Sequence, residues 1–259
     1  MSYGKKEVLK KASVSMHPKE TVCITGAADS GKTTILHLFL RAKTPDSGTV
    51  EADDVDIQLI PKHILQLYRR RFGVKFQGGE LLATRTAAEN IALPLEIQDK
   101  PLKHIDQTVQ QLLEEFQLQK VANLFPKDLS KSQTTLVALA RALAGSPMIL
   151  LLDEPLEDLD EKQSLLVISI LEKKQEESMS IITFSRDATL AHALKGRLVY
   201  LKNGKLTEAP SNTPETFSSH HIFTKFVFPL IKDREEQKST TSEKKSIAKK
   251  VRITAIHSR

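Results

Sequence analysis

The segment Gly26-Ala-Ala-Asp-Ser-Gly-Lys-Thr33 places two glycines, a lysine and a hydroxyl at the spacing of a phosphate-binding loop. It follows an apolar run, Thr21–Thr25, typical of a buried strand, and precedes a helical pattern at 33–41. In such a loop, backbone N–H groups and the helix N-terminus surround the phosphates of a nucleotide. We therefore predict a site for ATP with Mg²⁺ at Gly26, Ala27, Ala28, Asp29, Ser30, Gly31, Lys32, Thr33 and Thr34.

Particular side chains of this pattern have predicted roles. Lys32 would contact the β- and γ-phosphate oxygens, and the Thr33 hydroxyl would bind Mg²⁺. Further along, four apolar residues lead into Asp153-Glu154, where Asp153 would hold the metal through water and Glu154 would polarise the attacking water. The competing interpretation is two acids at a strand end. The phosphate loop upstream favours the functional one.

These residues need a framework of strands and helices to bring them together. The short apolar runs at 72–76, 148–152 and 180–184 are typical of parallel strands buried on both faces. The segment 78–145 has helical periodicity instead, and Lys202-Asn-Gly-Lys205 predicts a hairpin turn. The sequence therefore predicts an α/β fold with a mostly parallel sheet.

The order of these segments resembles the nucleotide-binding domain of the ABC ATPase family over residues 3–210. Gln77 matches the glutamine of the family's Q-loop, and Glu154-Pro155 with Leu159-Asp160 matches its Walker B and D-loop arrangement. The resemblance implies a P-loop NTPase core with N-terminal β elements and a helical insertion at about 78–145.

The resemblance also implies functional residues and a dimer. Gln77 would sense the γ-phosphate, act in catalysis with Glu154, and join Thr33 and Asp153 around the metal. Tyr3 would stack on adenine. In a head-to-tail homodimer, a signature loop reaches the partner's γ-phosphate, and the matching residues here are Ser130, Lys131, Ser132 and Gln133.

Within the family, several stretches are most similar to the cell-division ATPases of the FtsE type. The lipoprotein-release and macrolide-export ATPases are closely similar. The resemblance implies a subunit at the inner face of the cell membrane, coupled to an integral FtsX-like partner through the groove near Gln77 and the helical insertion. The stretches are Ile60–Pro61, Tyr68–Gly73, Phe76–Gln77 and Glu89–Pro94.

The sequence departs from the family pattern at functional positions. Asp29 replaces a glycine of the phosphate loop, Lys131 and Ser132 replace two glycines of the signature loop, and Arg186 stands where the family has its switch histidine. Arginine cannot shuttle a proton, so we expect slow hydrolysis. A nucleotide-gated scaffold with little turnover is the rival hypothesis. The soluble ABC-type ATPases of DNA repair or translation are a third class, but their coiled coils, zinc sites or second ATPase domain are not visible in this sequence.

The two ends of the chain carry separate expectations. The segment 1–11 lacks the apolar core of a signal peptide, which predicts a cytoplasmic protein. The strand and Ser-Lys that precede the family's adenine-stacking aromatic are missing. We expect either a domain without this edge strand or a start placed too late. Residues 211–231 contain an amphipathic piece expected to dock on the body.

The net charge of +6 is concentrated in the tail at 232–259, which has nine lysines and arginines against four acids. The remaining body is nearly neutral, and aromatic residues are only 5% of the full chain, so we expect no nucleic-acid partner. The tail composition predicts disorder. Its basic stretch 244–250 would meet anionic lipid or serve as a solvated tail, and the alternating residues at 251–256 would pair as a strand with a partner.

Overall fold

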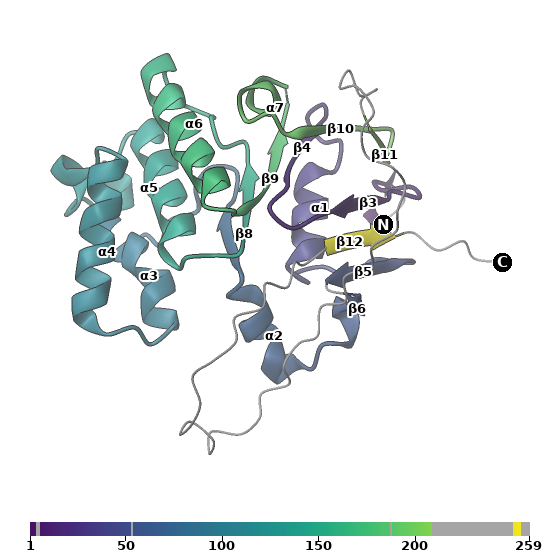
Figure 1. The fold of residues 1–259 in the computed structure, drawn as a ribbon, viewed down its shortest axis with the longest axis horizontal. Helices are drawn as coiled ribbons and strands as arrows, with labels where there is room; N and C mark the ends of the chain where they lie inside the picture. Colours follow the sequence, from purple (N-terminus) through teal and green to yellow (C-terminus); the bar gives the residue numbers. More distant parts are fainter. Residues whose placement is uncertain (4–5, 53, 187, 209–250, 255–259) are drawn as a thin grey trace.

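The structure is a computed structural model that describes residues 1–259 except 4–5, 53, 187, 209–250 and 255–259 (Figure 1). Its helices are α1 (Lys32–Phe39), α2 (Lys62–Arg69), α3 (Ala87–Ile97), α4 (Leu102–Glu115), α5 (Lys131–Ala144), α6 (Glu161–Glu176) and α7 (Thr189–Ala193), with short 3₁₀ turns at Ile57–Leu59, Gln119–Val121 and Pro126–Asp128. Its strands are β1 (Ser2–Tyr3), β2 (Lys6–Glu7), β3 (Val14–Met16), β4 (Thr21–Thr25), β5 (Thr49–Ala52), β6 (Val55–Asp56), β7 (Phe72–Lys75), β8 (Ile149–Asp153), β9 (Ser180–Ser185), β10 (Arg197–Lys202), β11 (Lys205–Glu208) and β12 (Val251–Thr254).

The central sheet has six strands in the order β11-β10-β4-β9-β8-β7. Its strands from β10 to β7 are parallel, and β11 pairs antiparallel with β10. All five residues of β4 and of β8 are buried, as expected for strands covered on both faces. The predicted α/β fold with a mostly parallel sheet is confirmed.

The hairpin turn between β10 and β11 also matches the prediction. Asn203 and Gly204 have φ angles of 52° and 75°, the left-handed conformation that a two-residue hairpin turn requires. This hairpin closes the central sheet beside the phosphate loop, because β10 pairs with β4.

Helices α3, α4 and α5 gather on one side of the molecule, within the segment where the helical insertion is expected (Figure 1). The inward positions of α4 follow the predicted period, since Ile105, Val109, Leu112 and Leu113 are buried. Helix α5 packs against both α3 and β7. These helices therefore share a core that adjoins the central sheet, and the start of α5 carries the expected signature residues.

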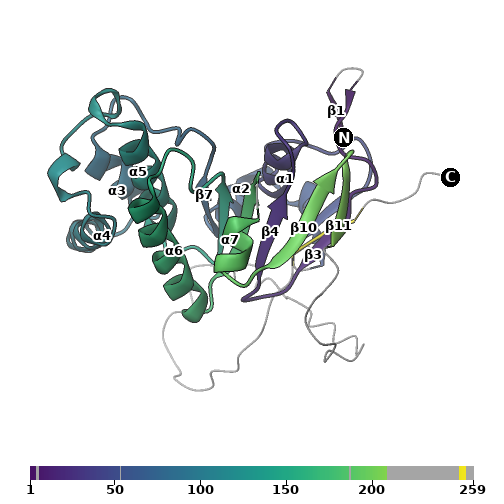
Figure 2. The same cartoon turned by 90° about the horizontal axis from the view of Figure 1, so that it is seen from above.

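A four-stranded antiparallel sheet lies on the opposite side, in the order β3-β12-β5-β6 (Figures 1 and 2). The strand β12 comes from the far end of the chain and pairs on both edges: Val251 lies opposite Met16 of β3 and Ala52 of β5. The segment expected to pair as a strand with a partner pairs at these four residues with two strands of its own chain.

Other expectations for the end of the chain lie outside the described residues, namely the docking segment at 211–231 and the lipid contact at 244–250. Across the part of the chain that the structure describes, no helix has both the length and the hydropathy needed to cross a membrane.

Candidate functional site

The loop between β4 and α1 has the backbone of a phosphate cradle. Gly31 has a φ of 107°, and a Cβ there would lie 2.6 Å from a Val8 methyl carbon. A Cβ at Gly26 would lie 2.6 Å from the carbonyl oxygen of Leu201. A side chain at either position would collide with a neighbouring residue, so glycine is required at both. The contact with Leu201 also shows that the loop packs against the β10 strand.

Asp29, the acid that departs from the family pattern, is compatible with this backbone. Its φ is 58°, in the left-handed region that aspartate tolerates better than most residues. The residue is exposed, so solvent screens its charge. It nevertheless lines the same pocket as Lys32 and Thr33, which leaves a negative charge at the rim of the cradle.

Lys32 is the first residue of α1 and is 7% exposed. Its ammonium donates to the carbonyl oxygens of Gly26 and Ala27, at 2.7 and 3.0 Å. The first turn of α1 contains no acid, so the positive end of the helix dipole is not neutralised there. A buried cation and a helix N-terminus thus lie at one pocket, which suits an anion.

That space is a pocket of about 490 Å³ between the phosphate loop and the ends of β7, β8 and β9. The hydroxyl of Ser30 is buried without a hydrogen-bond partner among the residues that the structure describes, which is costly unless a bound group supplies one. The lining residues are Val8, Ala28, Asp29, Ser30, Gly31, Lys32, Thr33, Thr34, Gln77, Asp153, Glu154 and Arg186.

Thr33 and Asp153 form the oxygen pair predicted to hold the metal. The Thr33 hydroxyl donates to the Asp153 carboxylate at 2.6 Å, although 120 residues separate them. Burial raises the pKa of Asp153, while the Thr33 hydrogen bond and the charges of Lys75 and Lys32 oppose that rise. Hydroxyl and carboxylate oxygens are ligands that Mg²⁺ prefers, so the residues present fit this ion.

Glu154 follows directly and has left-handed backbone, with a φ of 46°. Its carboxylate lies 3.8 Å from the Lys32 ammonium. It also accepts from Arg186 twice, at 3.3 Å from the backbone N–H and at 3.3 Å from Nε. The predicted catalytic acid is therefore placed at the pocket, but a cation occupies part of its hydrogen-bonding capacity.

Two residues beside the site have no role in the sequence-based prediction. Lys75 is fully buried in β7, and its ammonium donates to the carbonyls of Asp153 and Glu154 at 2.9 and 2.7 Å. Burial lowers the pKa of Lys75, and nearby carboxylates, Glu157 foremost, oppose the shift. A lysine inside an apolar strand is the signal that would have revealed it. Glu157, which accepts from Gln77 at 3.0 Å, had no comparable signal.

The signature residues lie apart from this pocket. They begin α5, where Ser130 accepts from the Gln133 backbone N–H at 3.2 Å and Gln133 accepts from the Ser130 backbone N–H at 2.8 Å. This reciprocal pair is a capping box, and it satisfies two groups at the helix end. Lys131 is exposed, and the Ser132 hydroxyl lies 3.2 Å from that of Ser130. Tyr3 lies in β1, and its stacking on adenine stays a prediction.

A strand, a glycine-bounded loop, a helix and a facing Asp-Glu pair define the class of P-loop nucleotide-binding proteins. Residues 9–157 match the family described as ABC transporter. The chain belongs to the ABC transporter family, as an ATP-binding domain. Members of this family bind ATP, generally with Mg²⁺.

Curated relatives support the same family. The methionine import ATP-binding protein MetN of Xanthomonas oryzae pv. oryzae is 34% identical over 209 residues, which are 80% of this chain and 62% of that protein. The chain thus spans less than two thirds of this relative. The glutamine transport ATP-binding protein GlnQ of Geobacillus stearothermophilus is 34% identical, covering 84% of this chain and 89% of that protein. The macrolide export protein MacB of Campylobacter jejuni is 33% identical over 78% of this chain and 32% of that protein.

Solved structures agree with the fold. The dimeric ATP-binding cassette MJ0796, in a post-hydrolysis state bound to ADP and phosphate, has a TM-score of 0.73 at 30% identity, covering 78% of this chain and 90% of that chain. The predicted ABC ATPase fold is confirmed.

Proposed function

We propose that the chain is the ATP-binding and ATP-hydrolysing subunit of an ABC-type membrane complex, and that two copies close around two MgATP molecules. The observation that carries this proposal is the Thr33–Asp153 contact of 2.6 Å directly beside the carboxylate of Glu154. It sets two oxygens suited to Mg²⁺ next to an acid that can polarise water, with the Lys32 ammonium 3.8 Å from that acid.

The proposed roles follow from these positions. Lys32 binds the β- and γ-phosphate oxygens, and Thr33, Asp153 and Gln77 hold Mg²⁺. When bound there, Mg²⁺ would supply positive charge against the negative charge of those oxygens. Glu154 accepts the proton of the attacking water. The Arg186 guanidinium contacts the terminal phosphate. It also competes with the attacking water for the Glu154 carboxylate, so turnover is slow.

The dimer is proposed because the signature residues lie away from their own chain's phosphate pocket. Ser130 to Gln133 begin a helix whose cap is already satisfied, and the Lys131 side chain is exposed next to it. A second copy, placed head to tail, would bring this helix start to the other copy's γ-phosphate. Centrifugation should then show dimers with MgATP and monomers without it.

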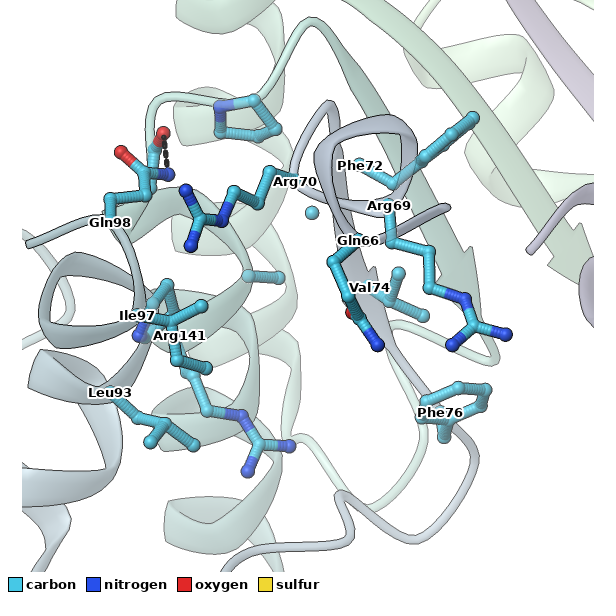
Figure 3. A pocket seen from close by; sticks show the side chains of 15 residues that line it. Gln66, Arg69, Arg70, Phe72, Val74, Phe76, Leu93, Ile97, Gln98 and Arg141 are labelled. Atoms are coloured by element: carbon cyan, nitrogen blue, oxygen red, sulfur yellow. Dashed lines mark hydrogen bonds between the residues drawn. The ribbon is translucent and has the colours of Figure 1, made fainter. Parts of the chain in front are cut away.

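A groove of about 370 Å³ is the proposed binding site for the membrane partner (Figure 3). Leu93, Ile97 and Arg141 line one side, and Phe72 and Phe76 line the other. Several stretches that resemble FtsE contribute to it, which supports an FtsX-like partner and a role in cell division or envelope remodelling. The contributing residues are Arg69, Arg70, Phe72, Gly73, Phe76, Leu93 and Pro94.

A second candidate is the ATPase subunit of an efflux or lipoprotein-release transporter, which the similarity to MacB favours. Co-purification separates the two. The chain would be expressed with an FtsX-like subunit or with an efflux permease, and the partner retained after detergent extraction identifies the complex. Ile97→Glu, which puts a charge in the groove, should abolish retention. Leu165→Glu, at an exposed site on α6, is the matched control.

Hydrolysis is tested by comparing phosphate release by the wild type and Glu154→Gln. We expect release that depends on Mg²⁺ in the wild type and background release in the variant. Equal rates would favour the rival nucleotide-gated scaffold, for which the contact of Arg186 with Glu154 is the supporting observation.

A further inference from the structure

Glu157 joins three segments that are distant in the sequence. It lies just after the Walker B acids, in the stretch between β8 and α6. One of its carboxylate oxygens, Oε1, accepts from the Gln77 side-chain amide at 3.0 Å and from Arg186 Nη2 at 3.0 Å. A single oxygen therefore binds both the Q-loop glutamine and the residue at the switch position.

These three side chains differ in whether they line the phosphate pocket. Gln77 and Arg186 line the phosphate pocket, whereas Glu157 does not. Glu157 reaches the pocket only through its two donors. It is consequently a positioning residue and not a catalytic one.

Arg186 lies between two carboxylates. Its Nε contacts Glu154 at 3.3 Å and its Nη2 contacts Glu157 at 3.0 Å. The Arg186 side chain is 53% exposed, while those of Glu154 and Glu157 are 11% and 25% exposed. Because the second carboxylate shares the guanidinium, Arg186 can leave Glu154 for an incoming anion while Glu157 still holds it at the pocket.

We propose that Glu157 couples Gln77 and Arg186 into a paired donor site for the third phosphate of a nucleoside triphosphate. The phosphate loop, Lys32 and the α1 N-terminus recognise the phosphates that ATP and ADP share. Gln77 and Arg186 line the same pocket, and Glu154 Oε1 lies 3.3 Å from Arg186 Nε and 3.8 Å from the Lys32 ammonium. In the proposed site Gln77 and Arg186 bind the third phosphate, which ADP lacks. Glu157 therefore sets the preference for ATP over ADP. This inference rests on the proposed function for the identity of the ligand, but it does not require turnover.

The experiment measures affinity for fluorescent ATP and ADP analogues with Mg²⁺, in the full chain. The variants are Glu157→Ala, Arg186→His and the double variant. We expect Glu157→Ala to lower the preference for ATP over ADP about tenfold, through ATP affinity alone, because a lost charge-assisted hydrogen bond has this size. In the Arg186→His background the same change should have less than half this effect, because the guanidinium partner is gone.

Glu172→Ala, which removes an exposed acid from α6, controls for net charge and should leave the preference unchanged. Glu157→Gln keeps the accepting oxygen and loses the charge, so an intermediate loss is expected. This variant decides the question if Glu157→Ala does not fold. An unchanged preference, or equal losses in both backgrounds, would overturn the proposal. Phosphate release by the wild type and Glu154→Gln tests the proposed function separately, since the affinity ratio needs no hydrolysis.

Discussion

The Arg186 guanidinium contacts the Glu154 carboxylate, with 3.3 Å between Nε and Oε1. The backbone N–H of Arg186 donates to the other carboxylate oxygen, also at 3.3 Å. Both oxygens of the proposed catalytic acid are therefore engaged before a water molecule arrives. A residue that departs from the family pattern thus contacts the group that hydrolysis requires.

We predict that Arg186→His increases kcat about threefold to tenfold, on the order of 1 kcal/mol of barrier. Histidine is a neutral donor near pH 7, so it competes less than a guanidinium does for the Glu154 carboxylate. Steady-state phosphate release measures the effect. The gain must disappear when Glu154→Gln is added, and a fall in kcat for the single variant would show that the arginine aids the reaction more than it restrains the acid.

Lys32 should govern nucleotide affinity. We predict that Lys32→Ala weakens MgATP binding about tenfold to a hundredfold, because a charge-assisted hydrogen bond contributes about 1.5–3 kcal/mol. Removal of the ammonium also frees the loop carbonyls of Gly26 and Ala27 that it now contacts. Calorimetric titration checks the affinity. Lys62→Ala, at an exposed position in α2, is the matched control, and an equal loss there would contradict the assignment.

Much of this site could be predicted from local sequence. The loop at 26–33 and the Asp153-Glu154 pair lie at strand ends, and the parallel strands β4 and β8 bring such ends to one edge of the sheet. The contact of Thr33 with Asp153 follows from that topology. Local sequence also predicted the hairpin, because Asn203-Gly204 favours one turn type.

Other features depend on tertiary distances that spacing does not encode. Glu157 contacts Gln77 across 80 positions and Arg186 across 29, and nothing in its neighbours marks it. Lys75 departs from an apolar strand pattern, so the sequence marks it. The sequence does not show that its ammonium contacts the backbone carbonyls of Asp153 and Glu154. β12 inserts between β3 and β5 because each of these strands offers it an edge for pairing, and no local sequence pattern predicts this.

Lys75 gives a prediction about pH and stability in the protein without nucleotide or metal. Its folded pKa lies below 10.5, the ordinary lysine value, so the unfolded chain binds more protons between the two. The free energy of unfolding should therefore increase with pH in that window, as the cost of burying the charge is relieved. Urea unfolding of the wild type and Lys75→Met, from about pH 7 to about pH 10, isolates this residue. The wild type should gain stability relative to the variant, and parallel curves would contradict the assignment.

Removal of β12 should destabilise the antiparallel sheet. Val251–Thr254 pairs with β3 on one edge and β5 on the other, so among the described strands its loss leaves β3 without a ladder partner and β5 paired with β6 alone. Each ladder hydrogen bond contributes about 0.5–1.5 kcal/mol net, so we predict a loss of about 2 kcal/mol or more. The comparison is a chain ending at residue 250 against one ending at residue 254, which differ by β12 alone. Urea midpoints should separate the two, and the shorter chain should expose the β3 amides to hydrogen exchange. Identical midpoints and protection would mean that β12 adds nothing to the sheet, and that β3 and β5 are stabilised by their packing on α1 and β4 instead.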